Sequence, residues 1–351
     1  MESIHMKRII VTGAGGSAGI NFIDSIRSAP EKIFIVGTDI NKWHLELPDL
    51  DIKQVIPPAS NIIEYLTTLN KIIEEEKIEF VHPQPDVEVK VLSQNRDKLK
   101  AKTFLPSKDT IAICQDKVTL NKILKKQNIP VPLSFIISNR DDLQNAINNL
   151  KGINGKIWLR AKCGMGTRAA LPIKELRHGE MWIDYWKTTA NIGYGDFMAC
   201  EFLPGKEFAF QSVWKNGELI TSMARERLEY IFGHLTPSGQ YSSPSVAQTV
   251  HRADVNETAT KAILAVDKNA SGIFCVDLKE NQAGIPCVTE INAGRFFTTS
   301  NFFTKLGVNM PFIYLKLAYG EELPTLKKYN AAPEGYYWIR LMDKGPKLLK
   351  V

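Results

Sequence analysis

The chain has 351 residues, of which 44% are hydrophobic and 23% are charged, and its formal net charge is +6. This composition argues for a folded soluble protein, and the length predicts two or three cores rather than one. The mild positive charge suits an anionic small substrate, whereas nucleic acid is disfavoured because no basic block interleaved with aromatic residues appears.

The spacing of the cysteines, the histidines and the apolar residues argues against further classes of protein. Five cysteines lie far apart without a CxxC pair, which predicts reduced thiols and a cytoplasmic location. The histidines form no HExxH or paired-ligand spacing, so a zinc site is not expected. No apolar run approaches the ~20 residues of a membrane span, and the N-terminus lacks the apolar stretch of a signal peptide.

The first hundred residues alternate predicted strands and helices. Residues 8–29 indicate a buried strand, a glycine turn and a helix, and residues 32–41 indicate a second strand. Residues 61–78 carry apolar side chains at helical spacing. Residues 79–89 suggest a short strand that leaves into a loop at its two prolines. This alternation predicts a parallel, Rossmann-like sheet.

The pattern changes near residue 105, where a domain boundary is expected. A turn signal at Asn216-Gly217 marks a hairpin, which is typical of antiparallel strands. The second part is therefore predicted to be α+β. Its expected elements are a helix from 116 to about Pro130, a strand at 156–162, a glycine loop at 163–170, a connector and two strands at 197–225, a helix at 254–270 and two strands at 272–292.

The glycine turn at 13–19, "GAGGSAG", has two interpretations. It matches the outline of a dinucleotide fingerprint, and Asp39 at the end of the next predicted strand would bind a ribose hydroxyl of NAD. Alternatively, the glycines permit tight packing of a strand against a helix. The rest of the chain favours packing, because an oxidoreductase leaves the polar residues of the second half unexplained.

The two strands predicted at 272–292 bring acidic residues together. Asp277 lies on the first strand, and Glu290 and Asn292 share one face of the second. In a hairpin Asp277 and Glu290 lie opposite each other or nearly so, although Pro286 leaves the register open. Two close carboxylates repel unless cations intervene, and Mg²⁺ commonly binds through one or two carboxylates plus substrate phosphates. The alternative is an exposed hairpin face with solvated acids.

Further polar residues surround this hairpin in the sequence. Lys117 opens a predicted helix, Arg160 lies in an apolar predicted strand, and the glycine loop at 163–170 lets backbone N–H groups approach a phosphate. Glu207 follows the connector, and Arg295 follows the last strand. Each feature alone could be a solvated side chain or an ordinary turn, so their joint order carries the information.

This order of motifs, over about residues 7 to 325, resembles the ATP-grasp superfamily, especially one half of the carbamoyl-phosphate synthase large subunit and its carboxylate–amine ligase relatives. The resemblance implies an α/β and α+β protein, with an N-terminal Rossmann-like (pre-ATP-grasp) parallel sheet followed by a two-subdomain ATP-grasp fold. The expected divisions are a Rossmann-like domain at 1–105, a small subdomain with a glycine-rich lid at 106–200, a large subdomain with the nucleotide and metal site at 201–330, and a C-terminal segment at 331–351.

The resemblance also implies roles for individual residues. ATP phosphates are expected beneath a mobile lid, in contact with Lys117, Arg160, Gly164, Gly166, Thr167 and Arg168. Adenine and ribose are expected at the linker, in contact with Glu201, Phe202, Leu203 and Glu207. Mg²⁺, or alternatively Mn²⁺, would be held by Asp277, Glu290 and Asn292, and the transferred phosphoryl group or acyl phosphate by Arg295.

Two features depart from the superfamily pattern. Arg160 stands where many members have lysine, and Ala161 stands where proline is frequent. Members often have Asn-Pro-Arg where this chain has Asn292-Ala293-Gly294-Arg295. The additional residue leaves the direction of the Arg295 side chain open.

The favoured function is an ADP-forming ligase. A small-molecule carboxylate would attack the γ-phosphate of MgATP, and an amine, or less favourably a thiol, would displace phosphate from the acyl phosphate. Arg225 and Arg227 are candidates for binding the acceptor carboxylate, and Arg227 is also a catalytic candidate. The substrate is expected where the parallel strands end, near Gly15, Gly16, Gln84, Asp86 and Glu88.

Three other functions stay open: a nicotinamide-dependent oxidoreductase that uses the glycine turn, a non-catalytic nucleotide sensor, and carbamoyl-phosphate-synthase-like phosphorylation of a small carboxylate or carbamate without ligation. The expected partners are small-molecule carboxylate and amine substrates, without nucleic acid or membrane. A homodimer is an option.

Overall fold

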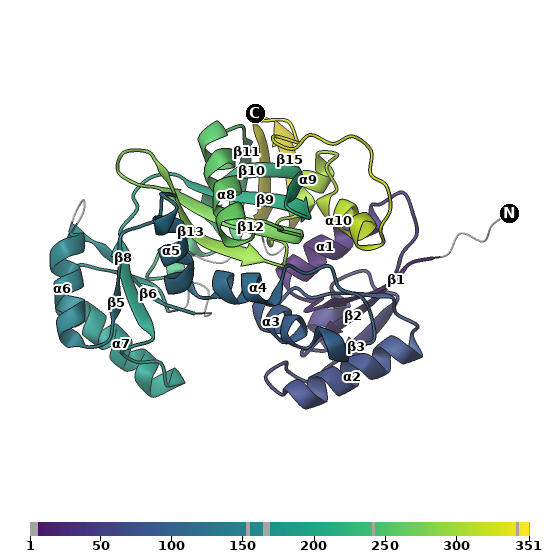
Figure 1. The fold of residues 1–351 in the computed structure, drawn as a ribbon, viewed down its shortest axis with the longest axis horizontal. Helices are drawn as coiled ribbons and strands as arrows, with labels where there is room; N and C mark the ends of the chain where they lie inside the picture. The colour runs from purple at the N-terminus through teal and green to yellow at the C-terminus, as the bar shows by residue number, and fades with distance from the viewer. Residues whose placement is uncertain (1–5, 152–154, 164–168, 241–242, 342–343, 351) are drawn as a thin grey trace.

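Three sheets organise the protein (Figure 1). A parallel sheet is built from the N-terminal part of the chain, and two antiparallel sheets follow, the smaller at the left of the figure and the larger at its centre. No described helix is long and apolar enough to cross a membrane. The computed structural model describes residues 6–151, 155–163, 169–240, 243–341 and 344–350.

The parallel sheet confirms the Rossmann-like prediction. Its strand order is β3 (Ile52–Val55), β2 (Phe34–Asp39), β1 (Arg8–Thr12), β4 (Phe80–His82). The middle of the central strand β1, Ile9 to Val11, is apolar because both faces of the strand are covered. Ile9 shares an apolar cluster with residues of α1 (Ser17–Arg27), and Ile10 shares another with residues of α2 (Ile62–Glu75). Two short 3₁₀ turns, η1 (His44–Glu46) and η2 (Arg96–Lys98), complete this part.

The expectation of a loop after β4 is wrong. Helix α3 (Asp86–Gln94) begins directly after Pro85, whose backbone is still extended. Proline ends the strand but does not obstruct a helix that starts after it. Asp86 and Glu88 lie in the first turn, where the helix dipole favours negative charge. The acidic residues attributed to loop polarity therefore start a helix.

The smaller antiparallel sheet has the order β5 (Ser134–Ile137), β8 (Phe197–Glu201), β6 (Ile157–Ala161), β7 (Leu171–Ile173). Helices α6 (Arg140–Leu150) and α7 (Leu176–Ala190) cover one of its faces. Strand β8 corrects the expectation of a connector. It pairs on both sides, and its Phe197 and Ala199 are fully buried in the cluster under the helices.

The larger sheet is antiparallel throughout, which confirms the α+β prediction. Its order is β13 (Pro286–Ala293), β12 (Gly272–Glu280), β9 (Glu207–Lys215), β10 (Glu218–Tyr230), β11 (Pro244–Val250), β14 (Tyr336–Leu341), β15 (Lys344–Lys350). The predicted hairpin at Asn216-Gly217 joins β9 to β10, and both turn residues have positive φ, as a two-residue hairpin turn requires. A 3₁₀ turn, η4 (Gly233–Leu235), lies between β10 and β11.

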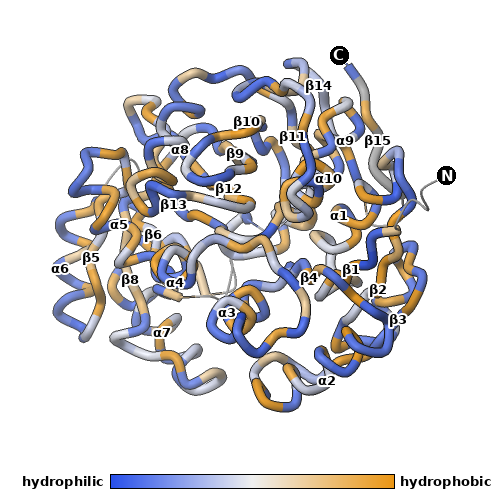
Figure 2. Tube along the Cα trace, turned by 45° about the vertical axis from the view of Figure 1, so that its right-hand side comes forward, coloured by the Kyte–Doolittle hydropathy of each residue, from blue (hydrophilic) through white to orange (hydrophobic). Residues whose placement is uncertain are grey.

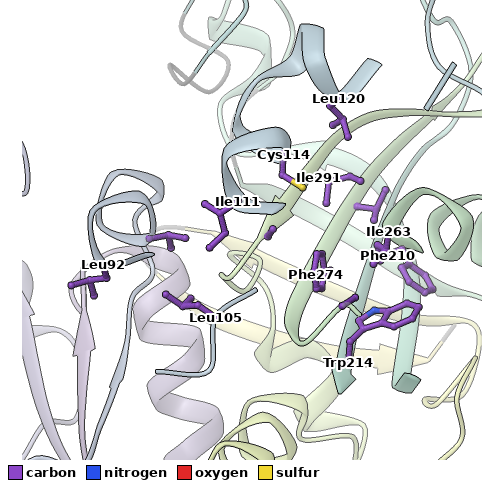
Figure 3. Packing of buried hydrophobic residues seen from close by; sticks show 14 of the residues in the cluster. Leu92, Leu105, Ile111, Cys114, Leu120, Phe210, Trp214, Ile263, Phe274 and Ile291 are labelled. Atoms are coloured by element: carbon purple, nitrogen blue, oxygen red, sulfur yellow. The ribbon is translucent and has the colours of Figure 1, made fainter. Parts of the chain in front are cut away.

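One face of the larger sheet packs on α4 (Lys108–Gln115), α5 (Lys117–Lys126) and α8 (Ala253–Val266). Figure 3 shows Cys114, Leu120 and Ile263 of these helices around Phe274 of the sheet. The same cluster continues to Leu92 of α3, so one apolar core joins the sheet to the N-terminal part.

The opposite face meets α9 (Asn301–Lys305) and α10 (Met310–Ala318). Figure 2 shows α10 beside α1, with apolar residues on both helices. Between them the buried His82 ring stacks on Phe22, with ring centroids 4.1 Å apart, and meets Phe296 edge-on. This face becomes polar along β10, β12 and β13, and the candidate site lies there.

Candidate functional site

The β12–β13 hairpin places two carboxylates face to face. Asp277 and Glu290 are direct register partners, so the predicted pairing is confirmed. They border a cavity of about 480 Å³ between the smaller and the larger sheet, within the roughly 300–1,000 Å³ of ligand pockets. The cavity is lined by residues that include Trp158, Arg160, Cys200, Glu201, Phe202, Leu203, Glu207, Arg227, Tyr230, Gln240, Asp277, Lys279, Glu290, Asn292, Arg295 and Phe297.

Glu290 stays ionised because cations from two other elements reach it. Arg160 donates a hydrogen bond to Oε2 at 3.0 Å, and Lys117 Nζ lies 3.5 Å from the same oxygen. Burial alone would raise the pKa of Glu290, but Lys117, Arg160 and Arg295 outweigh burial and lower the pKa from its ordinary 4.5 to about 2. Three cations around one acid leave a positive excess that suits a polyanion.

Asp277 has a different electrostatic environment. Arg227 Nη2 donates to Oδ1 at 2.5 Å, and Asn292 Nδ2 donates to Oδ2 at 3.2 Å. Burial raises the pKa of Asp277, the negative charges of Glu290 and Glu207 raise it further, and Arg227 opposes them. Asp277 therefore takes up a proton more readily than Glu290 when no other cation is present.

The additional residue before Arg295 is accommodated by Gly294. Its φ is +90°, a region that side chains disfavour, and a Cβ there would lie 3.0 Å from Leu105 Cδ2. The turn directs Arg295 to donate hydrogen bonds to Asn292 Oδ1 and to Asp86 Oδ1 of α3. Arg295 therefore borders the cavity while it is tethered to the N-terminal part of the chain.

Lys117 is positioned by the start of α5. The Asp116 side chain caps this helix by accepting from the N–H groups of Val118 and Thr119. The Lys117 N–H donates to the Lys162 carbonyl at 3.2 Å, which joins the helix to the segment after β6. Burial lowers the pKa of Lys117, and Glu290 opposes that shift. The two cations that the sequence proposed for phosphate contact thus converge on Glu290, which borders the cavity.

Glu207, proposed for ribose binding, is surrounded by donors. Arg227 Nη1 and Gln240 Nε2 each lie 3.1 Å from its oxygens, Lys279 Nζ lies at 3.3 Å, and the Tyr230 hydroxyl also donates to it. Arg227 and Lys279 lower the pKa of Glu207 against the effect of burial. At the linker, Glu201, Phe202 and Leu203 line the cavity as expected, and Glu201 Oε2 accepts from the Leu133 N–H at 3.3 Å.

Sequence reasoning missed several of the lining residues. Lys279 is two residues from Asp277 on β12, so strand periodicity alone could have placed it on the same face. Tyr230 ends β10 and Gln240 lies in the connection to β11, where no motif marks them. Trp158 is two residues before Arg160 on β6 and could have been found in the same way as Lys279.

The residues proposed for substrate binding do not line the cavity, namely Gly15, Gly16, Gln84, Asp86, Glu88 and Arg225. Gly15 is buried beneath His44, and Gly16 is exposed. Gln84 is buried, donates to the Ala18 carbonyl and accepts from the Phe296 N–H, each at 3.1 Å. Asp86 pairs with Arg295. Arg225 is fully buried behind the cavity wall. A substrate role for these residues therefore stays a prediction that the cavity lining does not support by itself.

The groups of the glycine turn that could bind a nucleotide already contact other parts of the protein. Asp39 Oδ2 accepts from the Gly15 N–H at 3.1 Å, and Oδ1 accepts from the Asn41 N–H at 2.9 Å. A Cβ at Gly13 would meet Pro85 at 2.4 Å. Both oxygens proposed for a ribose thus serve the local backbone, which supports the packing interpretation.

The metal candidates comprise two carboxylates and one amide. In the part of the chain that the structure describes, no three or more His, Cys, Asp or Glu side chains converge on one point. Such a small oxygen donor set fits Mg²⁺, which keeps waters and phosphate oxygens as its other ligands. The lid residues Gly164, Gly166, Thr167 and Arg168 lie outside the described residues, so the lid stays a prediction.

A parallel sheet followed by two antiparallel α+β halves around a polar cavity is the architecture of the ATP-grasp enzymes. This chain has the ATP-grasp fold, as the sequence predicted. A scan of the sequence against known family models finds no match.

Three solved structures illustrate the likeness. An L-amino acid ligase from Bacillus licheniformis has 11% identity and a TM-score of 0.69, over 96% of this chain and 79% of that one. Carboxyaminoimidazole ribonucleotide synthase from Aspergillus clavatus, solved with ATP, has 14% identity and a TM-score of 0.69 over 95% and 81%. The biotin carboxylase domain of 2-oxoglutarate carboxylase from Hydrogenobacter thermophilus, solved with MgADP, ADP and bicarbonate, has 14% identity and a TM-score of 0.70 over 95% and 74%. Identities this low establish the fold alone.

Proposed function

We propose that the protein is an ATP-dependent, ADP-forming ligase that activates a small-molecule carboxylate as an acyl phosphate and joins it to an amine. The observation that carries this proposal is the facing pair Asp277 and Glu290, which borders a cavity together with Arg160, Arg227 and Arg295. Paired oxygen donors inside a ring of cations suit a metal–polyphosphate complex better than a neutral ligand.

In this proposal the nucleotide spans the cavity from the linker to the hairpin. Adenine lies against Phe202 and Leu203, and the ribose hydroxyls replace a donor such as Gln240 on Glu207. The phosphates approach Lys117 and Arg160, beneath the loop at 164–168. The neighbouring structures solved with ATP and with MgADP support a nucleotide in this fold.

The metal of this proposal is Mg²⁺, and Mn²⁺ accepts the same oxygen donors. Asp277, Glu290 and the amide oxygen of Asn292 would hold it. When bound, the metal neutralises phosphate charge and thereby assists transfer of the phosphoryl group. Its charge would also lower the pKa of Asp277, which Glu290 and burial otherwise raise.

The chemistry needs positioning and charge neutralisation rather than a protein nucleophile. A carboxylate oxygen of the substrate attacks the γ-phosphorus, the bond from that phosphorus to the bridging oxygen breaks, and ADP departs. An amine then attacks the acyl carbon, phosphate leaves, and the amine nitrogen loses a proton. Arg295 and Arg227 line the cavity beside the carboxylate pair and stabilise the negative charge on the transferred group.

The proposal includes a domain organisation of the chain. Residues 1–105 form the Rossmann-like domain, 106–200 the small subdomain with the lid, 201–330 the large subdomain with the nucleotide and metal site, and 331–351 a C-terminal segment. Arg295 connects the first and third of these through Asp86.

The test is a screen of small carboxylates and amines for ADP and phosphate release with MgATP. Hydroxylamine, as a general amine, would trap an acyl phosphate as a hydroxamate, which separates ligation chemistry from simple ATP hydrolysis. We expect release that depends on one acid and a hydroxamate of that acid. Phosphorylation without ligation predicts acid-dependent ADP formation that amines do not accelerate. ADP binding without turnover for any acid would favour a nucleotide sensor.

A further inference from the structure

Arg225 of β10 is a buried cation that forms no hydrogen bond with the residues that the structure describes. Its side chain is fully buried, and none of its three nitrogens has a partner among the described residues. A guanidinium has five N–H donors, and a buried charge without compensation is costly. Buried charges in proteins are normally paired, so this arginine indicates a missing anion.

The surroundings of Arg225 offer further unused donors. Arg340 of β14 donates to the Pro244 and Thr298 carbonyls, each at 3.1 Å, while its Nη2 has no partner among the described residues. The hydroxyls of Thr299 and Ser300, which follow Thr298, are fully buried and likewise without a partner in the described part of the chain.

Among the described residues, no carboxylate forms an ion pair or hydrogen bond with Arg225. Asp277 acts on Arg225 electrostatically, but it already accepts hydrogen bonds from Arg227 and Asn292. Burial, reinforced by Arg227, lowers the pKa of Arg225 to about 9, and burial lowers that of Arg340 to about 10. Both shifts mean that the surroundings disfavour the positive charge until an anion arrives.

The group lies directly behind the cavity wall. Phe297 and Thr298 line the cavity, whereas Arg225 does not, and its guanidinium lies 4.6 Å from the centroid of the Phe297 ring. Arg225 and Asp277 occupy one row of the sheet, separated by Ala209 of β9. Two strand spacings put their backbones about 10 Å apart.

We propose that the acid substrate carries a second anionic group, which enters past Phe297 and is bound by Arg225 with Arg340 and the hydroxyls of Thr299 and Ser300. This inference rests on the proposed ligase function, because it assigns the first carboxylate to the phosphoryl-transfer site beside Asp277. The fork of Arg225 suits bidentate binding of a carboxylate or a phosphate-like group.

The experiment measures thermal shifts and calorimetric affinities of the full chain at constant ionic strength. The probes are malonate, succinate and glutarate, each compared with its monomethyl ester, which keeps the length but loses one charge. 3-Phosphonopropionate distinguishes a phosphate-type second group from a carboxylate. We expect at least one diacid to raise Tm more than its ester does.

The decisive variant is Arg225→Met. We expect it to fold, with Tm raised by a few degrees because an unpaired buried charge is removed, and to bind the effective diacid at least tenfold more weakly. Arg252→Met is the matched control, because Arg252 is paired with Asp254 and Glu280. That variant should lower Tm and keep the preference for the diacid.

The preference for diacid over ester decides the inference. Its presence in the wild type and loss in Arg225→Met support the second-anion site. Its absence in the wild type, or its persistence in Arg225→Met, overturns it. The Tm change on adding MgATP is measured in parallel. If MgATP does not stabilise the wild type, the proposed function is contradicted. If MgATP raises the Tm of Arg225→Met as it does that of the wild type, only the acid site has changed.

Discussion

Glu290 is the residue whose charge the site controls most tightly, because Lys117 and Arg160 converge on one of its oxygens. Glu290→Gln keeps the shape but removes the negative charge that would offset a metal. We expect phosphate release to fall by about 100-fold or more. Asp277→Asn should be less damaging, because an amide oxygen can still coordinate. Steady-state phosphate release with circular dichroism as a folding control checks both, and full activity of Glu290→Gln would contradict the metal assignment.

The lowered pKa of Glu290 makes the free energy of unfolding depend on pH, and the direction of that dependence follows from the shift. Between pH 4.5 and about 2 the unfolded chain binds a proton at this residue that the folded protein does not. Stability therefore rises with pH in that window. We expect wild type and Glu290→Gln to differ in free energy of unfolding at pH 7, and the difference to shrink as pH falls below about 4.5.

Denaturant unfolding from pH 7 to about pH 2.5 measures this difference across the window. Glu218→Gln is the control, because Glu218 pairs with Lys328 at the exposed surface, where solvent screens the interaction. The free energy of unfolding of Glu218→Gln should stay close to that of the wild type at every pH. A constant gap between wild type and Glu290→Gln over the whole range would show that the cations do not hold the Glu290 charge.

At the scale of an element, the turn that ends β13 directs Arg295. Gly294→Ala would place a side chain at φ +90° and 3.0 Å from Leu105. We expect a loss of about 1–3 kcal/mol in stability and a drop in turnover that exceeds any change in nucleotide affinity, because Arg295 is displaced.

The matched control for this turn is Gly284→Ala. Gly284 also has positive φ, +75°, but no atom lies within 4 Å of the added Cβ, and it lies in the distal β12–β13 turn. It should lose stability through backbone strain while keeping turnover. Calorimetry and phosphate release on both variants make the comparison, and equal activity of the two would count against a role for Arg295.

At the scale of the whole molecule, the glycine turn and the cavity compete as nucleotide sites. The Asp39 carboxylate is used by the Gly15 and Asn41 N–H groups, whereas the cavity carries free space and excess positive charge. We expect MgATP to raise Tm and NAD and NADP to leave it unchanged. Calorimetric titration provides the affinities. Micromolar binding of a nicotinamide cofactor would overturn the packing interpretation of the turn.

Local periodicity determined much of the architecture in advance. Apolar runs predicted the parallel strands, and helical spacing at 61–78 predicted α2. Such predictions work because burial of one or both faces of an element requires apolar residues at a regular spacing. The pairing of Asp277 with Glu290 could be anticipated, because a hairpin relates residues that are close in the chain. The α3 helix was missed because two prolines and acidic residues are equally typical of a loop and of a helix start.

Long-range packing decided the rest. The contact between Arg295 and Asp86 joins residues 209 positions apart, and no local pattern encodes such a partner. The same limit applies to charge. Residue type predicts a cation at Arg160 and at Arg225, but only the folded neighbourhood pairs the first with Glu290 and leaves the second buried without a hydrogen bond to any described residue. A sequence by itself determines which faces are apolar and which turns are allowed. Which polar groups meet across the sheets depends on tertiary packing, because the free energy of a buried charge is set by its neighbours in space.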